Sequence, residues 1–202
     1  MNRPAGPVAN VRAPARPRLG RAERRAAIID AAAHAFAVTG FTGTSMADIT
    51  AVAGVSHLIV YRHFDSKEAL YSAVLDRALE QLAAALDAPN AIDTYGPTPR
   101  AVLASARADP HAFSVLWNHA AREPEFAAQA KRAQRRLGRA TRAALTPLVS
   151  PQSLTWATRA TLIYVVQAVL VWIEDGDPRY DDRFVRATRA AMRAGVRSWV
   201  EP

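Results

Sequence analysis

Residues 53–70 read AGVSHLIVYRHFDSKEAL and carry the strongest pattern in the chain. Gly54 can end one helix, because glycine readily adopts the left-handed conformation found at helix C-termini. Ser56 can cap the next helix, and Val55 and Val60 have the spacing of a hydrophobic staple around that cap. A helix, a tight turn and a second helix therefore follow one another directly. This order predicts a helix-turn-helix unit.

The second helix of this unit has apolar residues on two sides. At about 100° per residue, Val60 and Phe64 point in one direction, which we take as the core side. The opposite side carries Leu58, Ile59 and Arg62. In a DNA major groove an arginine can hold guanine with two hydrogen bonds, and aliphatic groups can pack on thymine methyl groups. We predict that this side reads DNA; the alternative is that Leu58 and Ile59 pack elsewhere on this protein.

Helical patterns continue on both sides of the unit. Upstream, apolar residues at helical spacing predict a helix that ends at Gly40, followed by a helix that Thr44 or Ser45 caps. Downstream, a fourth helix runs to about Asp87 and has an apolar stripe at i, i+4 spacing, formed by Leu70, Val74, Ala78 and Leu82. After a loop, further helices are expected at roughly 98–108, 110–122, 124–145, 152–174 and 179–200. No strand-length alternation appears, so the fold is predicted to be all-α.

Composition limits the classes of function. Of the 202 residues half are hydrophobic, and there is no cysteine, which excludes disulfides, thiolate metal sites and cysteine nucleophiles. The net charge of +8 favours polyanionic partners, although an arginine excess could equally reflect a GC-rich genome. Residues 1–18 are rich in proline and arginine and predict a disordered basic arm. Arg16, Arg18 and Arg21 could enter the minor groove; the alternative is a leader with no role.

Signals for catalysis or membrane insertion are missing from the sequence. The five histidines show no i, i+4 pairing, and neither a glycine-rich phosphate loop nor a Gly-x-Ser-x-Gly motif occurs. We therefore predict a non-enzymatic protein with no catalytic residue, no metal and no cofactor. The longest apolar stretch, residues 162–173, is shorter than the ~20 residues that span a membrane. No secretory signal appears either, so a soluble cytoplasmic protein without a membrane partner is expected.

A family resemblance rests on a long ordered motif between about residues 21 and 75. This segment resembles the DNA-binding domain of the TetR family of bacterial regulators through Thr44-Ser45-Met46-x-Asp48-Ile49, Ala53-Gly54-Val55-Ser56 and Tyr61-x-His63-Phe64-x-Ser66-Lys67-Glu68-x-Leu70. The resemblance implies a three-helix helix-turn-helix domain joined by a connecting helix to a larger helical ligand-binding and dimerisation domain. The implied division is an arm at 1–18, a DNA-binding domain at 19–66 and an effector-binding and dimerisation domain at 67–202.

The resemblance also implies roles for single residues. Thr44 or Ser45 would anchor the second helix to a phosphate, and Tyr61, His63 and Lys67 would contact the DNA backbone. These contacts set register without reading sequence. The readers would be His57, Leu58, Ile59 and Arg62. Many members have smaller residues at the positions of Leu58 and Ile59, so this chain is predicted to prefer thymines at the contacted steps.

The C-terminal part is expected to provide a dimer surface and an effector pocket. The last two long helices would pair with their copies in a homodimer, with residues 154–173 apolar nearly all round and Phe184, Met192, Val196 and Val200 on one side of the final helix. A core within one chain is the alternative.

Four aromatic residues would line a slot for an unknown small-molecule effector, or serve as plain core: Phe113, Trp117, Trp156 and Tyr164. Further polar contacts would come from His111, Asn118 and His119. The arginines between residues 132 and 142 would form a solvated face, or one could pair with an acidic ligand group.

These predictions combine into one function. The chain is expected to be a ligand-responsive homodimeric repressor that binds a pseudo-palindromic DNA operator. The alternative is a helical ligand- or partner-binding protein whose recognition helix has lost specific DNA readout.

Overall fold

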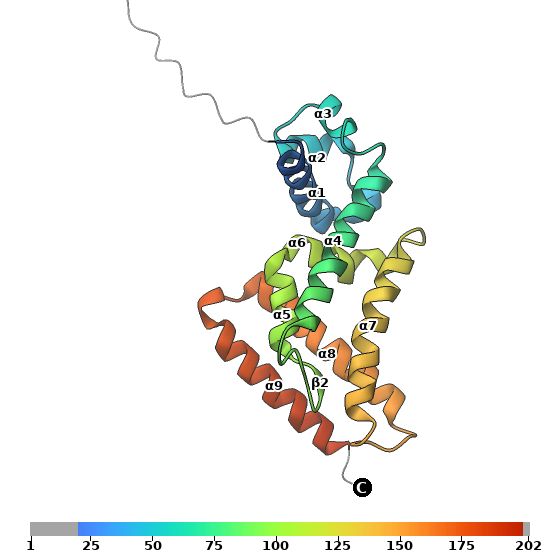
Figure 1. Cartoon of the computed structure of the whole chain (residues 1–202), viewed down its shortest axis with the longest axis vertical. Coiled ribbons are helices and arrows are strands. Elements are labelled where there is room, and N and C mark those ends of the chain that lie inside the picture. Colours follow the sequence, from blue (N-terminus) through green and yellow to red (C-terminus); the bar gives the residue numbers. More distant parts are fainter. Residues whose placement is uncertain (1–19, 200–202) are drawn as a thin grey trace, which may run out of the picture.

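The computed structural model describes residues 20–199, and helices make up most of this part of the chain (Figure 1). Three helices form a small upper unit: α1 (Arg21–Gly43), α2 (Met46–Ala53) and α3 (His57–Tyr61). The long α4 (Lys67–Asp87) runs from this unit into a larger lower group of helices. The predicted all-α class is confirmed for the described residues. The predicted basic arm and Val200 lie outside them.

The lower group is built from five further α-helices: α5 (Pro99–Ala108), α6 (Pro110–Ser114), α7 (Ala127–Leu145), α8 (Leu154–Asp175) and α9 (Asp181–Ser198). The helix predicted at 110–122 is interrupted, because α6 continues as a π-helical turn, η1 (Val115–His119), and a 3-10 turn, η2 (Ala120–Arg122). Another 3-10 turn, η3 (Pro178–Tyr180), precedes α9. The predicted loop before α5 contains a short antiparallel hairpin, β1 (Ile92–Asp93) with β2 (Gly96–Pro97), in which Ile92 lies opposite Pro97.

The junction of α1 and α2 is set by one glycine and one cap. Gly40 interrupts the helical backbone of α1 with φ 73° and ψ −175°, close to the predicted end of the helix. Only glycine adopts this conformation readily, and it turns the chain back toward the core. Ser45 then caps α2, accepting a hydrogen bond from the Asp48 amide, while the Asp48 carboxylate accepts one from the Ser45 amide at 2.8 Å. This reciprocal capping box fixes where α2 begins.

Aromatic side chains join the upper unit to the lower helices. Tyr71 of α4 packs against Phe36 and Phe41 of α1, with ring centroids 4.8 and 5.1 Å apart. Phe126, just before α7, lies 4.5 Å from Tyr71 and 5.0 Å from Phe41. The four rings belong to one continuous hydrophobic core that extends from α1 to α9. A displacement of α4 or α7 would therefore be transmitted directly to α1 through this aromatic cluster.

The two last helices bury one side each within this chain. Met192 and Val196, predicted to face a partner chain, are buried at 4 % and 1 % exposure. Phe184 stacks on Trp172 with ring centroids 4.8 Å apart. The predicted partner-facing side of α9 is therefore part of the chain's own core, because α9 folds back along α5 and α8. By length and composition alone, α1 and α8 could each span a membrane, but both are core helices of this fold.

Candidate nucleic-acid interface

The turn between α2 and α3 has the geometry that the sequence predicts. Gly54 adopts φ 62° and ψ 32°, the left-handed conformation, and its amide donates to the carbonyl of Ala51. A Cβ atom at Gly54 would meet nothing within 4 Å, so the backbone angle alone requires glycine there. Ser56 occupies the N-cap position of α3 without a side-chain capping bond, and Val55 packs against the hydrophobic core.

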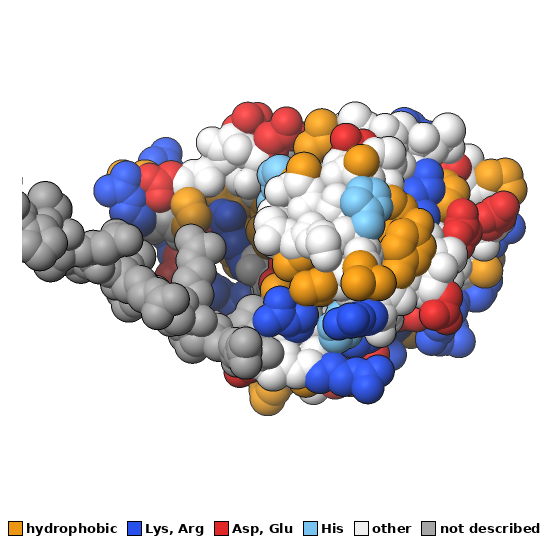
Figure 2. Space-filling model, turned by 90° about the horizontal axis from the view of Figure 1, so that it is seen from above, with side chains coloured by type: hydrophobic (Ala, Val, Ile, Leu, Met, Phe, Trp, Pro, Cys, Tyr) orange, Lys and Arg blue, Asp and Glu red, His pale blue; other side chains and the backbone are white. Residues whose placement is uncertain are grey.

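The outer face of α3 projects from the free end of the upper unit. Leu58 is 62 % exposed, Tyr61 is 48 % exposed, and His57 and Arg62 are also exposed. Val60 on the opposite side is fully buried. Seen from this end of the molecule, hydrophobic, histidine and basic side chains lie next to one another (Figure 2). Such a mixture can contact both phosphates and base edges.

Ile59 differs from the prediction that it points away from the core together with Leu58. Its side chain is only partly exposed and packs against the main hydrophobic core. The reason is geometric, because Ile59 lies about 100° around the helix from buried Val60 and so sits on the flank. His63 is likewise partly buried, in the turn that follows α3. Of the predicted readers, His57, Leu58 and Arg62 are the most accessible.

Of the two predicted phosphate anchors at the start of α2, Ser45 is the accessible one. Thr44 is 3 % exposed, and its hydroxyl donates to the carbonyl of Gly40 at 2.7 Å. A phosphate could not reach that hydroxyl without breaking this internal bond. Ser45 is exposed at the helix N-terminus, although its hydroxyl already donates to Asp48 at 2.7 Å. These bonds lower the pKa of the Asp48 carboxyl and keep it ionised at the edge of this face.

Lys67, which the resemblance places in contact with the DNA backbone, also has partners inside the protein. Its ammonium donates to the carbonyls of Phe41 and Thr44, both at 2.9 Å, and lies over the Phe41 ring. Two of its three donors are therefore used inside the protein. They satisfy carbonyls at the end of α1, where the helix leaves acceptors without an intrahelical partner. The third donor remains for a DNA phosphate, so the expected contact of Lys67 to DNA stays a prediction.

Arg24 and Arg25, at the start of α1, were not among the predicted DNA-contacting residues, whereas Arg21 was predicted to enter the minor groove. Arg25 is exposed, and its guanidinium lies 4.7 Å from the centroid of the Phe64 ring, next to the end of α3. Arg21 and Arg24 belong to the same first turns of α1. The spacing was available in the sequence, because Arg21, Arg24 and Arg25 precede Ile28 by seven, four and three residues and so continue its side of the helix. They add positive charge beside the recognition helix, where phosphates would pass.

The four aromatic residues predicted to line an effector slot do not come together. Phe113 is buried and lies 6.1 Å from the Trp117 ring. Trp156, however, is 46 % exposed and packs against Trp199 near the C-terminus, while Tyr164 is 40 % exposed on the outside of α8. The prediction was wrong because α8 is apolar on nearly all sides, so the sequence does not indicate toward which side its aromatic side chains point. A cleft of about 390 Å³ does collect His111, Asn118 and Glu174 near Ala37 of α1.

The side chains exposed around α3 are suited to binding. Exposed hydroxyl, imidazole, phenol and guanidinium groups stand around one short helix and can donate hydrogen bonds to phosphates and base edges. Within residues 20–199, no group of three or more histidine or carboxylate side chains could hold a metal ion.

Comparison with known proteins agrees with this geometry. Residues 28–74 match the family described as bacterial regulatory proteins, tetR family. The HTH-type transcriptional activator FasR of Mycolicibacterium smegmatis is 32 % identical over 185 residues, which cover 85 % of this chain and 82 % of that protein. An HTH-type transcriptional repressor of Mycobacterium tuberculosis is 49 % identical over 57 residues, 28 % of this chain and 30 % of that protein. A TetR-like transcriptional regulator from Rhodococcus sp. RHA1 has the same fold, with TM-score 0.70, 23 % identity and coverage of 89 % of this chain and 98 % of that one.

Proposed function

Because the chain belongs to the TetR family of bacterial regulatory proteins, we propose that it is a ligand-responsive, homodimeric repressor of a pseudo-palindromic operator. It would act in the cytoplasm by binding and not by catalysis. The observation that carries the proposal is the outer face of α3, where Leu58 and Arg62 are exposed on a helix whose opposite side is buried. The domain division at residues 66 and 67 is part of the proposal, since Ser66 caps α4.

A homodimer is supported by an exposed apolar face on α8. Ile163, Tyr164 and Val171 are 55 %, 40 % and 57 % exposed and recur at helical spacing on one side. Large apolar groups gathered on one helix face mark a contact surface more often than scattered ones do. Small side chains on the exposed side of α9 would let two copies approach closely: Ala187, Ala190, Ala191 and Ala194. We propose this face of α8 and α9 as the dimer surface, in place of the Met192 side of α9 that was predicted from the sequence.

Three contacts support coupling between the lower helices and the DNA-binding unit. Arg77 of α4 pairs with Asp30 of α1 at 2.5 Å and with Asp109, which caps α6. The Nε2 atom of His119 lies 3.1 Å from the carbonyl oxygen of Ala37. Effector binding that moves α4 or η1 would therefore tilt α1 and change the separation of the two recognition helices. Both must fit successive major grooves about 34 Å apart, so a shift of a few ångströms would release the DNA.

The cleft near Ala37 is the proposed effector site. It is lined by His111, Asn118 and Glu174, together with apolar groups of α8, and adjoins the η1 turn. Polar groups converging on a partly apolar cleft are the usual composition of a small-molecule site. A ligand there would touch α1, α6 and α8 together, which gives it the differential contact that a switch requires.

Activation is a second candidate for the direction of control. The relative that spans most of the chain is named as an activator, whereas a shorter match to the DNA-binding segment is named as a repressor. A reporter fused to the promoter upstream of this gene separates the two. Deleting the gene should raise reporter output for a repressor and lower it for an activator.

A mobility shift on the DNA just upstream of its own gene tests the function itself. A discrete complex that survives excess competitor DNA supports the regulator. Only diffuse, salt-sensitive retardation would support the alternative of a helical binding protein without specific readout, because phosphate contacts alone depend steeply on salt.

A further inference from the structure

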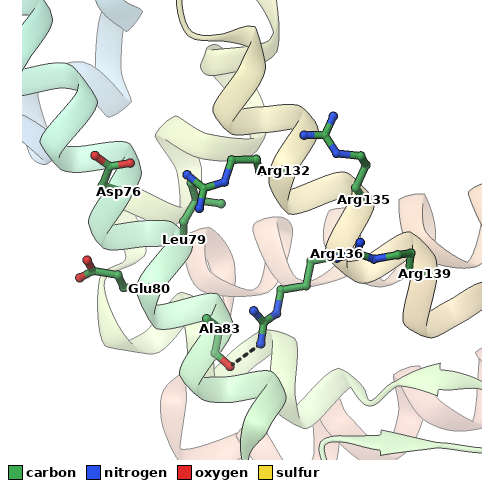
Figure 3. A pocket seen from close by; sticks show the side chains of 8 residues that line it. All are labelled: Asp76, Leu79, Glu80, Ala83, Arg132, Arg135, Arg136 and Arg139. Atoms are coloured by element: carbon green, nitrogen blue, oxygen red, sulfur yellow. Dashed lines mark hydrogen bonds between the residues drawn. The ribbon is translucent and has the colours of Figure 1, made fainter.

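A cleft between α4 and α7 is lined by four arginines. It has a volume of about 570 Å³, within the range of ~300–1,000 Å³ typical of small-molecule sites. The arginines all come from α7: Arg132, Arg135, Arg136 and Arg139. Figure 3 shows Arg132 and Arg136 reaching from α7 toward α4, where Leu79 and Ala83 add apolar side chains. The cleft does not share a lining residue with the one near Ala37.

The charge of α7 is unbalanced along its whole length. Residues Ala127–Leu145 include six basic side chains and no acidic one. The four arginines of the cleft are spaced i, i+3, i+4 and i+7, so like charges face one another, which destabilises a helix. Only Arg136 is compensated within residues 20–199, by Asp87 at 2.6 Å and the Ala83 carbonyl at 3.5 Å. An anion held among these arginines would relieve this repulsion.

Two carboxylates of α4 also line the cleft and limit what it can bind. Asp76 and Glu80 lie across from α7 and form no ion pair with a described residue. Four arginines against two carboxylates leave the lining at +2, and this positive charge is concentrated on the α7 side. An anion with a single charge gains little binding free energy in this cleft. A compact anion with several charges can engage two or more guanidinium forks at once, and phosphate oxygens match that fork geometry.

We propose that the cleft between α4 and α7 binds a small molecule that carries two or more linked phosphate groups. The phosphates would lie along Arg132, Arg136 and Arg139. Asp76 and Glu80 would repel the phosphates, so binding would favour a wider separation of α4 from α7. Because α4 also carries Arg77, which pairs with Asp30 of α1, the site is placed to influence the DNA-binding unit. Its use in regulation rests on the proposed function, whereas the binding itself does not.

Titration calorimetry of the full chain with inorganic triphosphate, in 0.15 M salt and without DNA, tests the site. We expect saturable binding to one site per chain. Arg132→Gln and Arg139→Gln should each weaken it roughly tenfold, because each removes a charge-assisted contact. Neither side chain forms an ion pair within residues 20–199, so both variants should fold normally. Glu80→Gln should strengthen binding by removing a carboxylate that repels the phosphates.

The matched control is Arg142→Gln, which removes the same charge from the same helix outside the cleft. It should change the affinity about threefold or less. Equal losses in Arg142→Gln and Arg139→Gln would overturn the proposal, because they would indicate general attraction to a chain of charge +8. Absence of saturable binding to the wild-type chain would overturn it as well. So would a larger effect of Arg139→Gln on random duplex DNA than on triphosphate, which would make the cleft a nucleic-acid surface. Since no operator is used, failure here leaves the proposed function intact.

Discussion

The ammonium of Lys67 lies 4.2 Å from the centroid of the Phe41 ring and donates to the Phe41 carbonyl at 2.9 Å. A cation–π contact and a charge-assisted hydrogen bond thus join the first residue of α4 to the end of α1. The same ammonium also holds the carbonyl of Thr44, just before α2. Lys67 therefore fixes the position of the helix-turn-helix unit on the connecting helix.

Replacing Lys67 by methionine should lower the free energy of unfolding by ~1–3 kcal/mol. It removes the charged donor of the Phe41 and Thr44 carbonyls, and Phe41 keeps only the long bond from the Thr44 amide at 3.4 Å. Chemical denaturation measures this loss. Lys131→Met is the control, because Lys131 is the only other lysine and is exposed on α7. Unchanged stability together with a salt slope of DNA binding reduced by about one unit would instead make Lys67 a plain phosphate contact.

Arg62→Ala should cost ~1–3 kcal/mol of binding free energy on the best operator and relax the preference at one base pair. The physical reason is the loss of two hydrogen bonds to a guanine edge. Affinity measured on a panel of single-base operator variants checks this. Arg25→Ala is the comparison, because Arg25 lies beside the end of α3 and would contact phosphates. Equal weakening of binding by Arg62→Ala on every DNA sequence would show that Arg62 contacts only the DNA backbone, as expected of Arg25.

Leu58 and Ile59 should respond differently to truncation. Leu58→Ala should change stability by less than about 0.5 kcal/mol, because the side chain is 62 % exposed, yet weaken operator binding. Ile59→Ala should lower stability more, since part of Ile59 packs against the core. Thermal unfolding and operator titration of both variants check the pair. Intact operator affinity in Leu58→Ala would show that its exposed methyl groups touch no base.

Acidification should destabilise the junction of α1 and α6 through His111. Burial and the nearby His34 lower the pKa of His111, against a smaller opposite effect of Asp109, which is itself paired with Arg77. The unfolded chain therefore takes up the proton first as pH falls through about 6.5, and stability decreases toward the lower folded pKa. Melting temperatures between pH 7.5 and 5.5 should fall less in His111→Gln, and also in His34→Gln. An identical pH dependence in all three proteins would contradict this.

Features that depend on residues close in sequence could be predicted, whereas features that depend on contacts between distant residues could not. The turn at Gly54, a cap at Thr44 or Ser45 and the stripe from Leu70 to Leu82 were predictable, because caps, turns and helical periodicity depend on residues close in sequence. The internal role of Lys67 depends on carbonyls 23 and 26 residues away, which no local pattern indicates.

The candidate site and the lower helices show the same limit. Ile59 was misplaced because α3 is only five residues long and a helical wheel has little resolution over one turn. Trp156 and Tyr164 were misplaced because an apolar helix such as α8 has no polar side to orient it. The arginines of α7 were recognised as one helix face, but the cleft they line is created by α4, 53 residues earlier in the case of Ala83 and Arg136.

The exposed face of α8 provides the test of the dimer. Ile163→Asp combined with Val171→Asp should convert the chain from a dimer to a monomer of 21.9 kDa, because each burial of such a side chain stabilises an interface by ~1.5–3 kcal/mol. Light scattering at micromolar concentration measures the mass, and Ile92→Asp on the hairpin is the control for an exposed aliphatic group outside α8 and α9. The monomer should also lose most of its operator affinity, since one recognition helix covers only a half-site. A wild-type chain that already scatters as a monomer, or a double variant that remains dimeric, would exclude this face as the interface.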